Sequence, residues 1–133
     1  MRKTLGALKR GGAQLRFAAW CSVVIGTLMF GQWAFFLSAG QVPEVRTAPV
    51  ALAFHLVAEG ATAAALVVAG IALLRGVSRA RVLGLVANGM LIYTVIVSPG
   101  YFAQLGQWPL VGMFAVLLVL AVASVVQLAG HRD

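Results

Sequence analysis

The sequence places a carboxylate and an imidazole one helical turn apart inside an apolar run. Glu59 and His55 lie in the stretch from Val50 to Leu74, which holds no other charged side chain. Residues four apart share a face of an α-helix, so the two side chains are neighbours. A carboxylate at bilayer depth is costly and is expected to face the interior, to be paired or to be protonated. Such a pair can take up and release a proton near neutral pH, which suits a proton relay or a proton-coupled transporter.

Three further polar side chains fall at a similar depth. At 1.5 Å per residue, Glu59 lies about 13–14 Å from the outer edge of its span, near the midplane of a core about 30 Å thick. The same count places Thr27 and Tyr93 near the level of Glu59, and Gln32 near the level of His55. We therefore expect a binding site, open toward the outer face, made by Thr27, Gln32, His55, Glu59 and Tyr93.

Three interpretations of this site stay open. In the first, it binds or moves a proton, a cation or a small lipophilic molecule. In the second, Glu59 and His55 satisfy each other as a contact between helices, and the chain is a structural or assembly subunit of a membrane complex. In the third, the chain is a small membrane oxidoreductase with a metal or a haem. His55 and Glu59 supply only two metal ligands where most sites need three or four, although a homodimer would double that number. One histidine gives one haem ligand, so a bis-His haem site would need a dimer.

Other polar residues in the apolar runs give no sign of catalysis. Ser22 and Ser98 have no base in evident register with them, and no Gly-x-Ser-x-Gly motif is present. Asn88 stands alone in its run, and we expect its amide to bond to another helix, with Gly84 one turn away admitting that neighbour. Small residues that repeat every four positions are expected to mark close contacts between helices: Ala61, Ala65 and Ala69, and likewise Gly60 and Ala64. The sequence therefore assigns no catalytic residue and no cofactor.

The composition is that of a membrane protein. Hydrophobic residues make up 62% of the 133 residues and charged residues 10%, whereas soluble domains carry roughly 25% charged residues. So few charges do not cover a water-facing surface, and the lipid bilayer is the expected surrounding. The net charge of +7 does not indicate nucleic acid, because nine of the ten Lys and Arg residues flank apolar runs and no nucleic-acid motif is present.

Four apolar runs predict the fold. They are continuous and roughly 17–25 residues long, whereas barrel strands would alternate over about ten residues. We expect one all-α domain over residues 1–133, an up-down-up-down bundle of four transmembrane helices that follows a basic segment at 1–16. Pro99-Gly100 is expected to end the third helix. The expected spans are about 17–39, 50–74, 82–98 and 110–128.

The basic residues predict the orientation. Five Lys and Arg residues precede the first span, three lie in the 75–81 connector and one follows the last span, while the two opposite loops together hold only Arg46. By the positive-inside rule, both termini are expected in the cytoplasm and the chain in the inner (plasma) membrane. A chain this small is expected to form a homo-oligomer if it provides a pathway.

Two pieces of the sequence resemble known proteins. One is His55-Leu-Val-Ala-Glu59, and the other runs from Tyr93 to Tyr101 and on to Trp108-Pro109. Together they resemble small, uncharacterised bacterial proteins with four transmembrane helices, over roughly the last two-thirds of the chain. The resemblance implies a four-helix membrane fold and no known activity. The small multidrug resistance exporters do not match, because their essential glutamate is in the first span, and the motifs of the DoxX-like proteins do not align.

Overall fold

The protein is helical throughout the part that its computed structural model describes, residues 1–131, apart from the side chains of residues 4–11, 13 and 14. No strand occurs in that part. The expected all-α class is confirmed, with four segments long and apolar enough to cross a membrane: Leu15–Ser38, Pro49–Leu74, Ala80–Gln104 and Trp108–Gly130. The helices are α1 (Arg2–Ser38), α2 (Glu44–Thr47), α3 (Pro49–Leu74), α4 (Ala80–Val97), α5 (Pro99–Gln104) and α6 (Trp108–Gly130).

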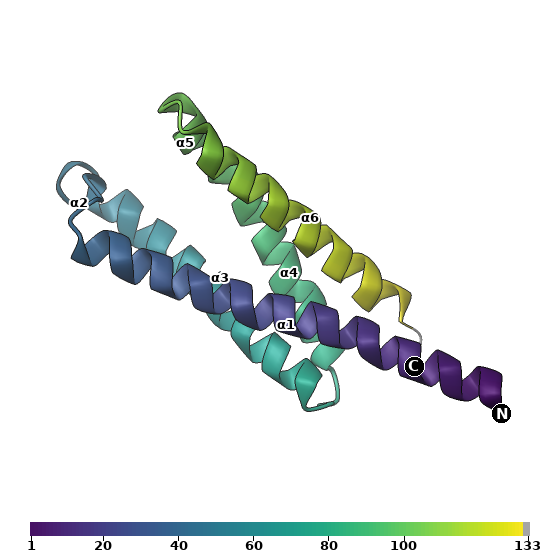
Figure 1. Ribbon diagram of the computed structural model, residues 1–133. Coiled ribbons are helices and arrows are strands. Elements are labelled where there is room, and N and C mark those ends of the chain that lie inside the picture. The colour runs from purple at the N-terminus through teal and green to yellow at the C-terminus, as the bar shows by residue number, and fades with distance from the viewer. Residues whose placement is uncertain (132–133) are drawn as a thin grey trace.

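The four long helices alternate in direction. α1 lies against α3, α3 against α4, and α4 against α6, while α6 also contacts α1 and closes the bundle. Both termini and the α3–α4 connector lie at one end, and the short helices α2 and α5 lie at the other (Figure 1). The expected up-down-up-down order is therefore the order seen, and the termini end is the one that carries most of the basic residues.

α1 is longer than its expected span, because it continues from Arg2 through the basic segment 1–16 without a break, and no proline interrupts it. The third helix ends where it was expected to end, since α4 stops at Val97, just before Pro99-Gly100. Ser98 stays in the right-handed helical region, and Pro99 opens the short helix α5 at a first-turn position, where its missing N–H has no helical partner to lose. The apolar segment that begins with α4 therefore continues through α5 to Gln104.

α1 and α3 approach each other closely at two glycines. A Cβ on Gly26 would lie 2.7 Å from the carbonyl oxygen of Ala63, and a Cβ on Gly70 would lie 2.7 Å from that of Ala19. Each helix therefore contributes one glycine to the seam. Of the small residues expected to mark such a contact, Ala69 is buried in the core and Ala65 packs against it. Ala61 and Ala64 are exposed, and Gly60 has no neighbouring atom within 4 Å of a Cβ.

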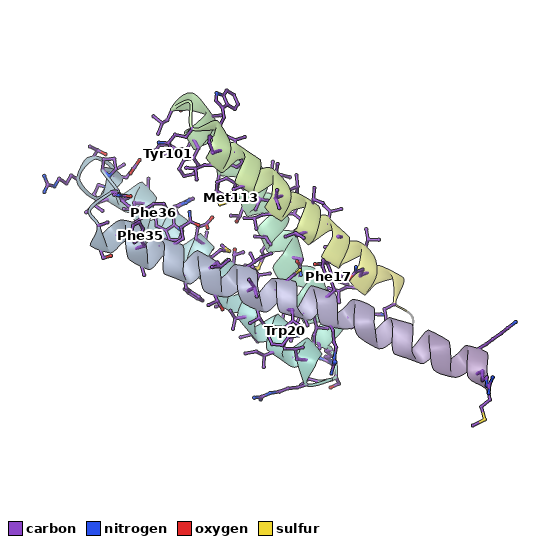
Figure 2. All side chains as sticks on the ribbon, in the orientation of Figure 1. Phe17, Trp20, Phe35, Phe36, Tyr101 and Met113 are labelled. Carbon is purple, nitrogen blue, oxygen red and sulfur yellow. The ribbon has the colours of Figure 1, made fainter. Side chains whose placement is uncertain are left out.

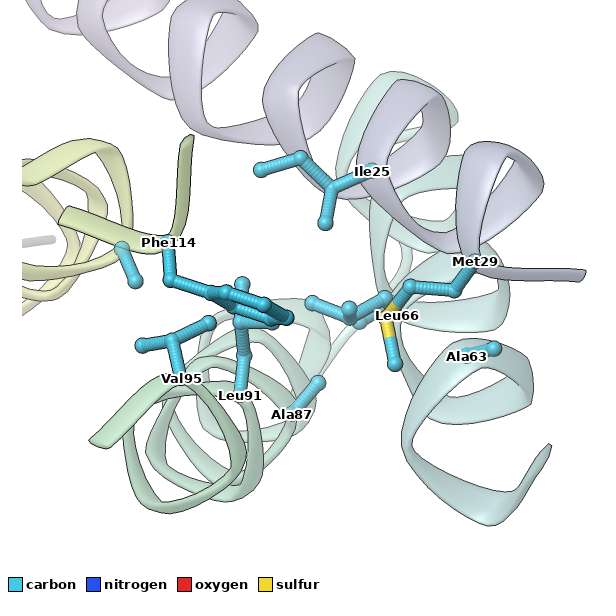
Figure 3. Close-up of a cluster of buried hydrophobic side chains, with 10 residues drawn as sticks. Ile25, Met29, Ala63, Leu66, Ala87, Leu91, Val95 and Phe114 are labelled. Atoms are coloured by element: carbon cyan, nitrogen blue, oxygen red, sulfur yellow. The ribbon is translucent and has the colours of Figure 1, made fainter. Parts of the chain in front are cut away.

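The core lies in the middle of the bundle and is filled from all four long helices. Figure 3 shows the apolar side chains that meet there, with Phe114 of α6 and Leu66 of α3 near the centre. Beside this core, the buried Asn88 of α4 donates from Nδ2 to Ser22 Oγ of α1 at 3.3 Å and to Gly84 O at 2.9 Å. Gly84 itself faces Leu128 of α6. The core therefore joins α1 to α4 by a polar contact and α4 to α6 by an apolar one.

Candidate functional site

A cleft of about 310 Å³ lies between α3 and α4. It occupies the half of the bundle nearer α2 and α5, since its α4 residues extend to Ser98 at the end of that helix. Apolar and small side chains make up much of the wall. The lining residues are His55, Ala58, Glu59, Ala61, Thr62, Met90, Tyr93, Thr94, Val97 and Ser98.

The helical repeat explains this lining. On α3, His55, Glu59 and Thr62 follow one another at spacings of four and three residues, so they share a face. The opposite wall of the cleft is formed by Met90, Thr94 and Val97 of α4. The Thr62 hydroxyl donates to Ala58 O at 2.8 Å, so it is already occupied within its own helix. The carboxylate of Glu59 is the strongest polar group left to meet a ligand.

Glu59 is half-buried and meets groups from three helices. His55, one turn along α3, interacts with it electrostatically. The side chains of Trp33 on α1 and Thr94 on α4 lie close enough to its carboxylate to help stabilise its negative charge. Both can donate, the first from its indole N–H and the second from its hydroxyl. The carboxylate is therefore held where α1, α3 and α4 meet.

His55 is exposed, and its ring is placed by Trp33. The two rings meet edge to face, with 5.5 Å between centroids and an angle of 70° between planes. Such contacts favour one ring orientation over others. Trp33 thus contacts both members of the His55–Glu59 pair. This role of Trp33 could not be predicted from the sequence, because a tryptophan near the end of a span is typical of an interfacial belt.

Two of the five expected site residues lie elsewhere. His55, Glu59 and Tyr93 line the cleft together, but Thr27 and Gln32 do not. Thr27 is exposed and its hydroxyl donates to Val23 O at 2.8 Å within α1. The depth count did not determine which face of α1 points toward the cleft, since each step along a helix turns the side chain by about 100°. On α1 it is Trp33, one step beyond Gln32, that reaches the site.

At the end of the bundle away from the termini, Glu44 of α2 lies close enough to Tyr101 of α5 for the two side chains to interact. Figure 2 shows Tyr101 extending from α5 on the side toward α2. This interaction lies in the same half of the bundle as the cleft (Figure 1).

The chain was compared with known proteins. The model of the domain of unknown function DUF8058 matches residues 13–132. The chain belongs to this family. No curated protein and no solved structure matches it. The DUF8058 match includes all the cleft residues, and because the family has no assigned activity, a function has to be argued from the cleft itself.

A metal centre is weakly supported in this DUF8058 protein. Among the described residues, no group of three or more His, Cys, Asp or Glu side chains comes together. His55 and Glu59 would be two ligands of a site whose others came from water, a hydroxyl or a second copy. Tyr93, Thr94 and Ser98 add hydroxyl groups to the cleft, which are suited to orienting an organic ligand by hydrogen bonds.

Proposed function

We propose that this membrane protein binds a small lipophilic cation in the α3–α4 cleft, with Glu59 as the counter-charge and a proton as the competing occupant. The observation that supports this most is that Glu59 lines an open cleft and is only half-buried. Of the chain's three acids, it alone falls in one of the four apolar segments. A carboxylate in such a place is a functional site by default.

The charge on Glu59 has three ways of being balanced. Protonated His55 can pair with it, a bound cation can pair with it, or a proton can neutralise it. Because all three use the same carboxylate, a cation and a proton exclude each other. Their exchange on one carboxylate is the elementary step of proton-coupled transport, and it needs no further acid in the membrane.

The walls of the cleft favour an organic cation over a hydrated metal ion. A volume of about 310 Å³ is at the small end of the range for ligand pockets. Ala58, Ala61 and Met90 offer apolar surface, and the ring of the exposed Tyr93 can face a positive charge. A metal ion would need several oxygen or nitrogen ligands at fixed distances. A quaternary ammonium group needs one counter-charge and apolar or aromatic surroundings.

One observation favours a second candidate, a structural role. Glu59 interacts with side chains of α1 and α4 as well as its own helix, so it can serve as a polar link between helices. In that case the chain is a structural or assembly subunit. The two candidates differ in one respect. A link needs Glu59 for folding, whereas a ligand site needs the cleft to stay open.

The orientation and assembly belong to the same proposal. The end that holds both termini carries nine of the ten Lys and Arg residues, so it is assigned to the cytoplasm, and the chain to the inner (plasma) membrane. The cleft then opens in the outer half of the bilayer. The cleft residues reach only half the length of the bundle. A chain this small is expected to form a homo-oligomer if it provides a pathway across the whole membrane.

Binding of phenyltrimethylammonium, a small permanent cation, tests the ligand site. It is measured by calorimetry on the full chain in lipid nanodiscs. Glu59→Gln is expected to weaken binding about tenfold or more, the size of a lost charge-assisted interaction. The neutral isostere tert-butylbenzene should compete at least about tenfold more weakly. Gln32→Leu is the control, since Gln32 lies outside the cleft, and its affinity should equal that of the native chain.

A second pair of variants separates the ligand site from the structural link. Ala61→Phe fills the cleft from its exposed side and leaves Glu59 in place, whereas Ala64→Phe puts the same group on an exposed part of α3 outside the cleft. Only Ala61→Phe should abolish binding. Equal binding by both variants, or native affinity in Glu59→Gln, would show that the cleft is not the site. If Glu59→Gln unfolds and Ala61→Phe changes nothing, the structural role is correct.

A further inference from the structure

A second depression lies between α1 and α6 and has no polar lining. It has a volume of about 230 Å³ and is lined by Trp20, Cys21, Val24 and Ile25 of α1 and by Leu120 of α6. Trp20 and Val24 are exposed there, so the groove opens to the surroundings of the bundle. Around a membrane protein, those surroundings are lipid chains. An apolar, lipid-facing groove suits an acyl chain.

The basic end of α1 adjoins this groove. Arg16 is exposed and precedes Trp20 by four residues, so the two side chains share a face of α1. Arg16 also begins the apolar segment of α1, at Leu15–Ser38, so its charge lies at headgroup level. Arg2 and Lys3 are exposed further along the same end of the chain, and no acid occurs in residues 1–16. The charge of Arg16 at the membrane surface matches the headgroup of an anionic lipid, and the apolar groove next to it matches the acyl chain of the same lipid.

We propose that the α1–α6 groove binds an anionic phospholipid, with an acyl chain along Trp20, Val24 and Leu120 and the headgroup phosphate at Arg16. The charge complementarity selects this occupant over a zwitterionic lipid, because a basic residue near the membrane surface favours anionic headgroups. The site is separate from the α3–α4 cleft and does not depend on its function. The amphipathic indole of Trp20 suits the boundary between headgroup and chain.

Native mass spectrometry of the full chain tests the headgroup contact. The protein is released from detergent containing equal amounts of dioleoyl phosphatidylglycerol and dioleoyl phosphatidylcholine, and bound lipid is counted. The native chain should retain phosphatidylglycerol preferentially. Arg16→Gln should reduce that preference about fivefold, as expected for one basic residue at the surface. Arg46→Gln removes a charge from the opposite end and should leave the preference unchanged. An equal loss in both variants would overturn the assignment to Arg16.

Filling the groove tests the acyl-chain contact. Val24→Trp occupies the groove from its exposed side, and Leu28→Trp places the same group one turn further along α1, outside it. Only Val24→Trp should lose bound lipid, with both variants unfolding within a few degrees of the native chain. Retention of lipid by Val24→Trp would refute the proposal.

The single cysteine tests the competing occupant, a second copy of the chain. If α1 of another copy fills the groove, its Cys21 comes close to the first, and mild oxidation should give a disulfide-linked dimer in high yield. A lipid-filled groove should keep Cys21 monomeric, and lipid extraction should raise its rate of reaction with a maleimide. Abundant Cys21 dimer in the lipid-replete protein would overturn the proposal.

Discussion

Trp33 of α1 and His55 of α3 meet edge to face, with their ring centroids 5.5 Å apart. Trp33 also interacts with the carboxylate of Glu59, one turn further along α3. One side chain of the first helix therefore contacts both ionisable groups of the second long helix. This contact fixes the pair from the side opposite α4, and it leaves the face toward Tyr93 for a ligand.

Trp33→Phe separates the two contacts of the indole. The substitution keeps an aromatic ring against His55 and removes the N–H that can donate to Glu59. A hydrogen bond to a carboxylate is worth about 1.5–3 kcal/mol. Without this donor a proton competes more strongly with the cation for Glu59, so the affinity for phenyltrimethylammonium should fall, by up to about tenfold, in calorimetry. Trp20→Phe, at the other end of the same helix, should bind as the native chain does. A fall of the same size in Trp20→Phe would point to a general change in α1.

Cation binding should depend on pH with a definite sign. Both protonation of His55 and protonation of Glu59 remove the free carboxylate that a cation needs, so affinity should decrease as the pH falls. A protonated His55 is a cation that pairs with the same carboxylate as the ligand. His55→Gln should therefore make the profile less steep and raise the affinity at its acidic end. Calorimetry of phenyltrimethylammonium at several pH values measures both effects. An unchanged profile in His55→Gln would show that His55 does not compete for Glu59.

The sequence was sufficient for the helices and for part of the site. Length and hydropathy fix where a chain crosses a bilayer, so the four apolar segments were predicted to within a few residues, apart from the extension past Pro99. The spacing of His55 and Glu59 fixed their common face without knowledge of any neighbour. Tyr93 was predicted from its depth alone, and it also lies on the face of α4 that lines the cleft.

The remaining site residues depend on how helices rotate against one another. Thr27 and Gln32 were chosen by depth alone, yet it is Trp33 that lies near Glu59, because the rotation of α1 follows from its packing on α3. That packing is determined by Gly26 and Gly70, whose neighbours come from a different helix. A glycine at a contact between two helices cannot be told from a glycine on an exposed helix face by sequence alone. Gly60 was therefore indistinguishable from Gly70 until the helix pair was known.

Alanine in place of glycine should destabilise the protein at the contact between α1 and α3, although the same substitution at an exposed glycine should not. Gly26→Ala and Gly70→Ala each place a methyl group 2.7 Å from a backbone oxygen of the facing helix. A backbone atom does not move aside as a side chain does, so the helices must separate, at a cost of about 1–3 kcal/mol for overpacking. Thermal unfolding in detergent, followed by circular dichroism, should show a lower midpoint for both variants.

Gly60→Ala is the matched control on α3. Nothing lies within 4 Å of its added methyl group, so the substitution should have only the effect of helix propensity, which favours alanine by up to about 1 kcal/mol. Its midpoint should equal or exceed that of the native chain. Because separation of α1 from α3 also moves Trp33 away from Glu59, Gly26→Ala should weaken cation binding while Gly60→Ala should not. A Gly26→Ala variant as stable as Gly60→Ala would mean that α1 and α3 do not approach at these glycines.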